Sequence, residues 1–309
     1  MNQYSVVIVD YGTLLRTLQF IEDFKRKCTD VDDVFFIIVD NYDHDDAGLK
    51  RKEVGFTKQS GSYLGWHGKS FSVYNQENIY LISVQKNVGY AKANNIGALF
   101  SHDVINARFT IFSNNDILFP EQFSLKYFTD TFFKEKNCFV LGPEVIGVDN
   151  KRQGPVQIND RVFDLLIQPY SIFKLFIKPT RTLALPNFTY GPVHHVVGCF
   201  MIVELRKFID VGMFDEYTFL YFEENILSER GKSKGLCFFY DSKVKIIHEG
   251  GGTIRKKVPS IKQEKLFFKS AYYYCQVYRK TKKNVLLLAK LNFKYFYIPL
   301  KWVITKIKI

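Results

Sequence analysis

The chain has 309 residues, a hydrophobic content of 47% and a formal net charge of +12. This length and composition fit one large or two small globular domains and exclude a disordered or fibrous chain. The five cysteines form neither C-x-x-C pairs nor a disulfide framework, which argues against a zinc knuckle and favours a reducing compartment.

The positive charge is concentrated at the carboxyl end of the chain. Residues 255–309 contain 15 lysines and arginines and one acidic residue, Glu264, for a net charge of +14. Residues 1–254 contain the other 28 basic and 30 acidic residues, for a net charge of −2. A nucleic-acid enzyme more often carries its positive charge around its cleft, so no nucleic acid is expected as a partner. A basic end rich in aromatic residues favours an anionic membrane surface.

The first part of the chain alternates β-rich apolar runs with helical segments. Apolar residues recur at helical spacing over 14–24, and a second helix is expected at about 91–100. The pattern predicts an α/β fold with a mostly parallel sheet flanked by helices, whose ligands bind beyond the carboxyl ends of the strands. The four runs that predict buried parallel strands are Ser5–Val9, Val34–Val39, Ile79–Val84 and Phe109–Ser113.

The second half of the chain is less regular. Residues 161–186 mix aromatic and basic residues, which fits either an amphipathic excursion or an ordinary surface helix packed on the core. Strands are expected at 196–203 and 243–247, and a helical pattern begins at Pro259. Lysines interrupt 285–309, so this segment is expected to lie on a membrane rather than to cross it, and to find fewer packing partners than the residues before it.

Acidic and amide side chains follow the predicted strands at the edge where an α/β sheet collects its ligands. Each cluster taken singly is typical of a turn or a helix cap, because Asp and Asn hydrogen-bond locally to the backbone. Their joint placement favours a binding site. The clusters are Asp40-Asn41, Asn87 to Asn95, Asn114-Asn115-Asp116 and Glu223-Glu224-Asn225.

A set of motifs in fixed order covers residues 4 to 255: Ser5–Val9, Ile38–Asn41, Asn87–Tyr90, Phe112–Asp116, Gly198–Ile202, Val211–Glu216, Phe219–Glu224 and Ile247-His248. This set resembles the family 2 glycosyltransferases of the GT-A fold, particularly the bacterial rhamnosyl- and galactosyltransferase-like branch. The resemblance implies a GT-A catalytic domain over 1–254, with a nucleotide-binding half of about 1–116 and an acceptor half of about 117–254. Residues 255–309 then form a basic, aromatic helical extension.

The resemblance also implies where the nucleotide-sugar donor binds. In that family a carboxylate after the second strand hydrogen-bonds the nucleobase, which places Asp40 against the imide N–H of uracil or thymine. Asn87 and Gly89 are placed beside the nucleotide, and Gly89 allows a close approach because it has no Cβ. Asn114 and Asn115 stand at the family's Asp-x-Asp motif, which binds the donor diphosphate.

A divalent metal is implied at the same motif. Asp116 keeps the anionic oxygen that Mg²⁺ or Mn²⁺ prefers, and such ions commonly use one or two carboxylates together with phosphates and water. His248 matches a family histidine that lies near the metal or the diphosphate. The metal would stabilise the charge that develops on the leaving diphosphate.

Direct displacement at an anomeric carbon needs a base that takes the acceptor hydroxyl's proton. The resemblance places Glu224 in this role, and Glu223 is the second candidate. The implied activity is an inverting, metal-dependent transfer of a hexose or deoxyhexose from a UDP- or dTDP-sugar to a hydroxyl of a lipid-linked or growing cell-surface saccharide. The expected location is cytoplasmic, on the inner face of the cytoplasmic membrane.

Two other functions stay open at this point. Asn114, Glu224 and Ile226 depart from the family pattern, which fits a catalytically weak sugar-nucleotide-binding protein. A nucleotidyltransferase on a similar sheet usually begins with a glycine-rich, basic phosphate loop, which Val9–Thr13 lacks. Trp66, His67, His194 and His195 match neither zinc-site spacing nor a Cys/His triad, and they are given no role.

Overall fold

The computed structural model describes residues 4–42, 53–59, 62–157, 161–170, 187–250 and 260–307. At the centre of the fold lie four parallel strands in the order β7-β1-β2-β6, and these are the four that the apolar runs predict. Their bounds are β1 Tyr4–Asp10, β2 Val34–Asp40, β6 Ile79–Ser83 and β7 Phe109–Ser113. Val6, Val7 and Ile8 of β1 are fully buried because both faces of the sheet are covered.

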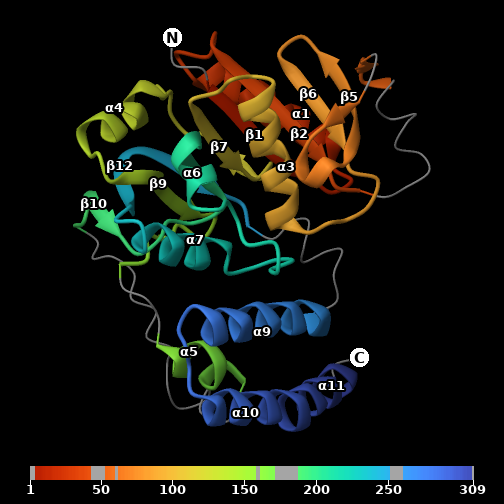
Figure 1. The fold of residues 1–309 in the computed structure, drawn as a ribbon, viewed down its shortest axis with the longest axis vertical. Helices are drawn as coiled ribbons and strands as arrows, with labels where there is room; N and C mark the ends of the chain where they lie inside the picture. The colour runs from red at the N-terminus through yellow and green to blue at the C-terminus, as the bar shows by residue number, and fades with distance from the viewer. Residues whose placement is uncertain are drawn as a thin grey trace.

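The sheet becomes mixed on both sides of this parallel centre (Figure 1). Beyond β7, β11 (Phe200–Glu204) runs antiparallel between β7 and β9 (Cys138–Gly147), and β12 (Cys237–His248) lies parallel to β9. Beyond β6, β5 (Ser70–Gln76) runs antiparallel to it. The expected parallel arrangement therefore holds for the centre β7-β1-β2-β6, and the sheet as a whole is mixed. The remaining strands are short: β3 Thr57–Lys58, β4 Tyr63–Leu64, β8 Ile117–Leu118 and β10 Tyr190–Val193.

The strand β9 is not predicted from the sequence because it contains Gly142-Pro143, a pair typical of a turn. In the structure, the pairing of β9 with β12 shifts its register between Tyr240 and Lys245, next to this pair. Such an irregularity accommodates a proline within a sheet. β12 is correspondingly longer than the expected 243–247, and β11 begins at Phe200 rather than at Val196.

Helices cover the two faces of the sheet. On one face, α1 (Leu14–Lys27) and α4 (Lys126–Lys134) pack against the side chains of Val6 and Ile8. On the other face, α3 (Tyr90–Asp103), α6 (Leu205–Asp210) and α7 (Glu223–Lys232) pack with Val7 and Ile37. Alternate residues of each central strand thus enter opposite cores, as the period of a strand requires.

A separate group of helices, here called the C-terminal helical unit, lies against α7 on the side away from α3 (Figure 1). Its core joins Phe268 and Tyr274 to Leu166 of α5, and it continues onto Phe222, directly before α7, and onto Ile226 of α7. The unit consists of α5 (Val162–Leu166), a short 3₁₀ turn (Gln168–Tyr170), α9 (Ser260–Val277), α10 (Lys283–Asn292), a π-helical turn (Phe293–Tyr297) and α11 (Ile298–Ile307).

The helical unit bears on two expectations from the sequence. Residues 161–170 form a short helix and turn packed on its core, while residues 171–186 of the same segment lie outside the described part of the chain. The segment 285–309 is not as poor in packing partners as expected, because Leu286, Ala289 and Phe293 are buried in the same core. Among the described helices, none combines the length and the apolar content needed to cross a bilayer.

Candidate functional site

The carboxyl ends of β1 and β2 place two aspartates side by side. Asp10 is in register with Asp40, and the Asp10 carboxylate accepts hydrogen bonds from the Thr13 N–H at 3.0 Å and from the Thr17 hydroxyl at 2.6 Å. The Asp10 carboxylate therefore stabilises the turn that starts α1. Asp40 is buried, and its Oδ1 accepts a bond from the backbone N–H of Tyr42 at 3.3 Å. The rings of Tyr42 and Tyr11 meet edge to face at 5.3 Å beside it.

Asn87 and Gly89 belong to the loop between β6 and α3. The Asn87 Oδ1 accepts from Asn41 Nδ2 at 3.1 Å and from the Gly89 N–H at 3.0 Å, while Asn41 Oδ1 accepts from the Val88 N–H at 2.8 Å. Gly89 has φ +88°, and a Cβ on it would lie 2.6 Å from the carbonyl oxygen of Phe219. The close approach at Gly89 is thus to the chain at Phe219, whereas the sequence predicts an approach to the nucleotide.

The Asn114-Asn115-Asp116 motif follows β7, and its members point to different places. Asn114 lines the main pocket of the described structure. Asn115 Nδ2 donates to the hydroxyls of Thr13 at 2.9 Å and Thr17 at 2.8 Å, so it stabilises the start of α1. Asp116 comes next to His248 because β8 pairs antiparallel with the end of β12.

Asp116 and His248 fit one side of a divalent metal site. Asp116 Oδ1 is buried without a hydrogen-bond partner in the described structure, and it lies 3.3 Å from His248 Nε2. His248 Nδ1 lies 2.8 Å from Gln153 Oε1, and an amide oxygen only accepts, so Nδ1 donates to it and Nε2 is the nitrogen that faces Asp116. Burial raises the pKa of Asp116, but His248 and Arg16 outweigh this effect and keep its pKa below the usual value. The carboxylate is therefore ionised, as a metal ligand must be.

The site offers a metal only a few protein ligands. Among the described residues, no group of three or more His, Cys, Asp or Glu side chains is arranged to hold an ion. This number suits Mg²⁺ or Mn²⁺, which complete their coordination with phosphates and water. It does not suit a structural zinc ion, which needs four protein ligands.

Glu223 and Glu224 are the first residues of α7, and the turn before them is strained. Tyr221 and Phe222 have φ angles of +74° and +72°, a region in which a bulky residue is a rare outlier. Such conformations cost on the order of 1–3 kcal/mol each and persist where the surroundings enforce them. We call residues 220–222 the strained turn. Local strain of this kind is typical of functional sites.

Helix α9 of the C-terminal helical unit holds the strained turn in place. The ring of Phe222 packs against Phe267 and Tyr274, with centroids 5.2 and 5.5 Å apart. The Ser270 hydroxyl donates to the carbonyl oxygen of Leu220 at 2.8 Å. The geometry of the two glutamates therefore depends on residues from the carboxyl end of the chain.

The two glutamates lie in different environments. Glu223 is 3% exposed, and its Oε1 has no hydrogen-bond partner among the described residues. Burial raises the pKa of Glu223 well above its usual range, and the charge of Glu224 adds to the shift. Glu223 is therefore the member of the pair that burial keeps protonated. Glu224 lies over Gly198, whose carbonyl oxygen accepts a 3.0 Å bond from the Tyr90 hydroxyl.

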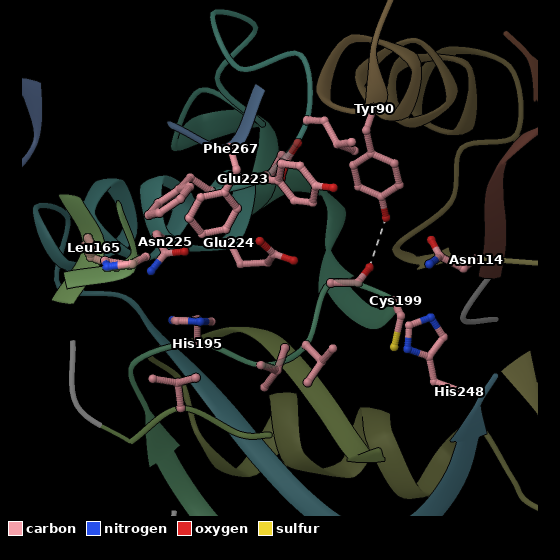
Figure 2. A pocket seen from close by; sticks show the side chains of 18 of the residues that line it. Tyr90, Asn114, Leu165, His195, Cys199, Glu223, Glu224, Asn225, His248 and Phe267 are labelled. Atoms are coloured by element: carbon pink, nitrogen blue, oxygen red, sulfur yellow. Dashed lines mark hydrogen bonds between the residues drawn. The ribbon is translucent and has the colours of Figure 1, made fainter. Parts of the chain in front are cut away.

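One pocket of about 600 Å³ connects these parts (Figure 2). At one end lie Asn114, Cys199 and His248 from the strand ends, and Glu224 reaches into the middle. The other end is lined by the C-terminal helical unit, through Leu165, Pro169, Tyr170, Glu264 and Phe267. Of the predicted site residues, Asn114, Glu223, Glu224 and His248 line this pocket, whereas Asp40, Asn87, Gly89, Asn115 and Asp116 lie outside its lining.

A polar cluster ties α9 to the loop before the strained turn. Asp215 is buried and accepts bonds from the hydroxyls of Tyr273 at 2.9 Å and Tyr278 at 2.6 Å. Its Oδ2 also lies 3.0 Å from the guanidinium of Arg230 on α7. Burial raises the pKa of Asp215, but these donors outweigh it, so its pKa lies below the usual value.

Sequence reasoning missed several residues that line the pocket. Tyr90 stands within the Asn87–Tyr90 motif, so the motif contained a signal for it. His195 faces Glu224 across the pocket in Figure 2, and its ring nitrogen lies 2.7 Å from that of buried His194. Phe267 and Glu264 come from α9, and no local pattern indicates that this helix reaches the pocket.

Comparison by sequence finds no relatives of the chain. No model of a known protein family matches it, and no curated protein matches it.

Comparison by structure gives matches over nearly the whole chain. A crystal structure of GalNAc-T7 with UDP, GalNAc and Mn²⁺ matches 99% of this chain with a TM-score of 0.53 at 13% identity, and the match spans 58% of that protein. The mannosyltransferase PcManGT from Pyrobaculum calidifontis, in complex with GDP-Man and Mn²⁺, matches 96% of this chain and 72% of its own, with a TM-score of 0.51 at 10% identity. A crystal structure of S. aureus TarS 1-349 matches 94% of this chain and 78% of its own, with a TM-score of 0.50 at 11% identity.

At such low identity these matches show the fold. The chain has a mixed α/β architecture around a large central sheet, and it shares the GT-A fold of these glycosyltransferases. The fold expected from the sequence motifs is confirmed.

Proposed function

We propose that the chain is a family 2 glycosyltransferase that moves a sugar from a nucleoside diphosphate to an acceptor hydroxyl. The observation that carries this proposal is one pocket that joins His248 and Asn114 at the strand ends to the side chain of Glu224 at the start of α7. A donor-binding edge and a general base in the same pocket are the two parts that direct displacement requires. Catalysis is assigned to residues 1–254, and 255–309 complete the pocket.

The donor is proposed to bind along the strand ends. Asp40 accepts the imide N–H of a uracil or thymine base, and the neighbouring Tyr11 and Tyr42 supply apolar ring surface for the base. A hexose or deoxyhexose is proposed as the transferred sugar, as the family resemblance of the motifs implies. Asp116 and His248 would hold Mg²⁺ or Mn²⁺ against the diphosphate, where such an ion neutralises charge on the leaving group.

Glu224 is proposed as the general base. Its carboxylate takes the proton from the acceptor hydroxyl as the hydroxyl oxygen bonds to the anomeric carbon and the bond to the diphosphate breaks, which inverts the configuration. The raised pKa of Glu223 keeps that residue protonated, so it is a poor base. The raised pKa of Glu223 supports Glu224 rather than Glu223 as the base in this proposal.

The acceptor is proposed to enter from the side of the C-terminal helical unit. That end of the pocket combines aromatic and apolar side chains with the Glu264 carboxylate, which suits a sugar ring and its hydroxyls. We propose a lipid-linked or growing cell-surface saccharide as the acceptor class, and the cytoplasmic face of the membrane as the place of reaction.

The test is a donor screen followed by an assay of transfer. UDP-, dTDP- and GDP-sugars are added with Mn²⁺, and the unfolding temperature is recorded, since a ligand at 100 times its Kd stabilises by about 2.7 kcal/mol. The stabilising donor is then incubated with acceptor, and release of the nucleoside diphosphate and the anomeric configuration of the product are measured. If a donor stabilises the protein but neither sugar transfer nor slow donor hydrolysis is detected, the result indicates a sugar-nucleotide-binding protein instead. No stabilisation by any donor would contradict the proposal.

A further inference from the structure

The helices α10 and α11, with the π-helical turn between them, carry apolar residues on two opposite sides. Their inner side packs into the core of the C-terminal helical unit through Leu286, Ala289 and Phe293. A helix that packs on one side only is expected to be polar on the other. Here the other side carries large apolar residues that are 42% to 71% exposed. We call them the outer apolar face: Leu287, Leu288, Leu291, Tyr295, Phe296, Leu300, Trp302 and Val303.

The spacing of these residues makes them one continuous surface. Leu288, Leu291 and Tyr295 follow each other at intervals of three and four. Phe296 in the π-helical turn is followed by Leu300 and Val303 of α11 at intervals of four and three. Contiguous exposed apolar surface on a soluble protein marks a binding surface rather than random exposure.

The charge around the outer apolar face selects its partner. Lys283, Lys290 and Lys294 are exposed beside it, and residues 283–303 contain no aspartate or glutamate. A second copy of the chain would bring two such lysine rows together, which like-charge repulsion disfavours. An anionic lipid surface accepts both the lysines and the apolar rings, because basic side chains bind headgroup phosphates and Trp and Tyr settle at headgroup level.

The position of the face connects it to the pocket. In Figure 1, α10 and α11 lie farthest from the sheet, and α9 lies between them and α7. The same helical unit lines the acceptor end of the pocket through Tyr170 and Phe267. A surface bound at the outer apolar face would therefore lie on the acceptor side of the molecule.

We propose that the outer apolar face lies flat on an anionic phospholipid bilayer, with its rings and leucines at headgroup level and its lysines among the phosphates. The membrane presents the lipid-linked acceptor to the helical side of the pocket. Only this last step rests on the proposed function, since the binding to lipid needs no donor, metal or acceptor.

The experiment measures vesicle binding of the full chain at low salt. The protein is sedimented with two kinds of vesicle. One contains phosphatidylcholine alone, and the other also contains about 30% of the anionic lipid phosphatidylglycerol. The apolar variant is Leu288→Ser/Phe296→Ser and the charge variant is Lys290→Glu/Lys294→Glu. Controls outside the C-terminal helical unit are Leu15→Ser in α1 and Lys134→Glu in α4, which are also exposed.

We expect the native chain to bind the anionic vesicles and to dissociate as salt is raised. Each double variant should lower the partition coefficient by at least about tenfold, and each control should leave it within about twofold. The chain contains two tryptophans, so in a Trp66→Phe background the emission of Trp302 should shift to shorter wavelength on binding. Brominated lipids should quench it.

Three results would overturn the inference. The first is no binding of the native chain to anionic vesicles at low salt. The second is equal loss of binding in the double variants and the controls. The third is a dimer in sedimentation velocity that the Leu288→Ser/Phe296→Ser variant dissolves, which would assign the face to a second copy. Donor hydrolysis, measured without lipid, should be unchanged in all variants, so a failure of lipid binding and a failure of the proposed activity are separable.

Discussion

The carboxylate of Glu224 lies directly over the α-carbon of Gly198. A Cβ built on Gly198 would fall 1.8 Å from Glu224 Oε1, a distance that no pair of nonbonded atoms tolerates. Glu224 is one of the positions at which the chain departs from the family pattern that its motifs resemble. The missing Cβ of Gly198 gives the Glu224 side chain the room it needs, so the two positions form one unit.

The first prediction follows from this contact. Gly198→Ala should push the Glu224 carboxylate out of place and lower turnover by about 100-fold, because small misplacements of a catalytic group are costly. Donor affinity and the unfolding temperature should change little. The double variant Gly198→Ala/Glu224→Asp should recover part of the lost turnover, because the shorter carboxylate avoids the new methyl group. Additive losses in a double-mutant cycle would show that the two residues act independently.

The second prediction separates the two glutamates. Glu224→Gln should lower turnover by a factor on the order of 10²–10⁴ with little change in donor affinity, as expected for the loss of a general base. Glu223→Gln should retain most of the activity, because the amide resembles the protonated acid already present. If Glu223→Gln is the more damaging variant, the base lies one residue earlier.

Glu223 also leads to a third prediction, on stability. Its folded-state pKa is raised, so its contribution to stability is complete below the unfolded pKa of about 4.3 and is lost as pH rises through the folded pKa. The Glu223→Gln variant has no proton to lose. As pH rises from about 5 to about 8, the free energy of unfolding of this variant, measured by urea denaturation, should therefore increase relative to that of the native chain. Parallel pH profiles for the two proteins would contradict this.

The fourth prediction concerns Asp116. Asp116→Asn should abolish metal-dependent turnover and weaken the stabilisation of the donor complex by Mn²⁺, while the apo protein keeps its unfolding temperature. The exposed Asp210→Asn serves as a control for the loss of one carboxylate. Transfer by Asp116→Asn at the native rate without divalent metal would show that the assignment of the metal site is wrong.

The fifth prediction concerns the attachment of α9. Asp215→Asn should lower the free energy of unfolding by about 2 kcal/mol at neutral pH, because it removes the charge from buried hydrogen bonds with Tyr273 and Tyr278. The pKa of Asp215 is lowered on folding, so this contribution is present above the unfolded pKa of about 3.9 and is lost as pH falls through the folded pKa. The two proteins should thus converge in stability below about pH 4. A difference in the free energy of unfolding between the two proteins that stays constant at every pH would contradict this prediction.

The sequence predicts the parallel centre of the sheet well, because β1 and β2 are short, continuous apolar runs whose burial on both faces leaves little ambiguity. It predicts β9 poorly, since Gly142-Pro143 is tolerated only through a register shift that the pairing with β12 provides. The local sequence pattern does not indicate that β9 pairs with a strand as distant in sequence as β12.

The candidate site shows the same division. The two motifs that contain Asp116 and His248 could be recognised along the chain, and the structure brings these two residues together. The role of Asn115 at the start of α1, and that of Gly89 against Phe219, depend on contacts between segments distant in sequence. The strain at Tyr221 and Phe222 could not be inferred from composition, because nothing in these residue types favours a left-handed backbone.

The contact of α9 with the strained turn also limits how the protein can be shortened or rearranged. A cut after residue 254 would divide the chain at the border suggested by its charge, but it would remove Phe267, Ser270 and Tyr274 from beneath the turn. Phe222 and Ile226 would then face water, and the turn could relax to an ordinary backbone conformation. The resulting fragment would keep its sheet and lose the orientation of its acidic pair. The helix α9 is thus part of the structure that positions the acidic pair, and its removal would change the geometry of the pocket.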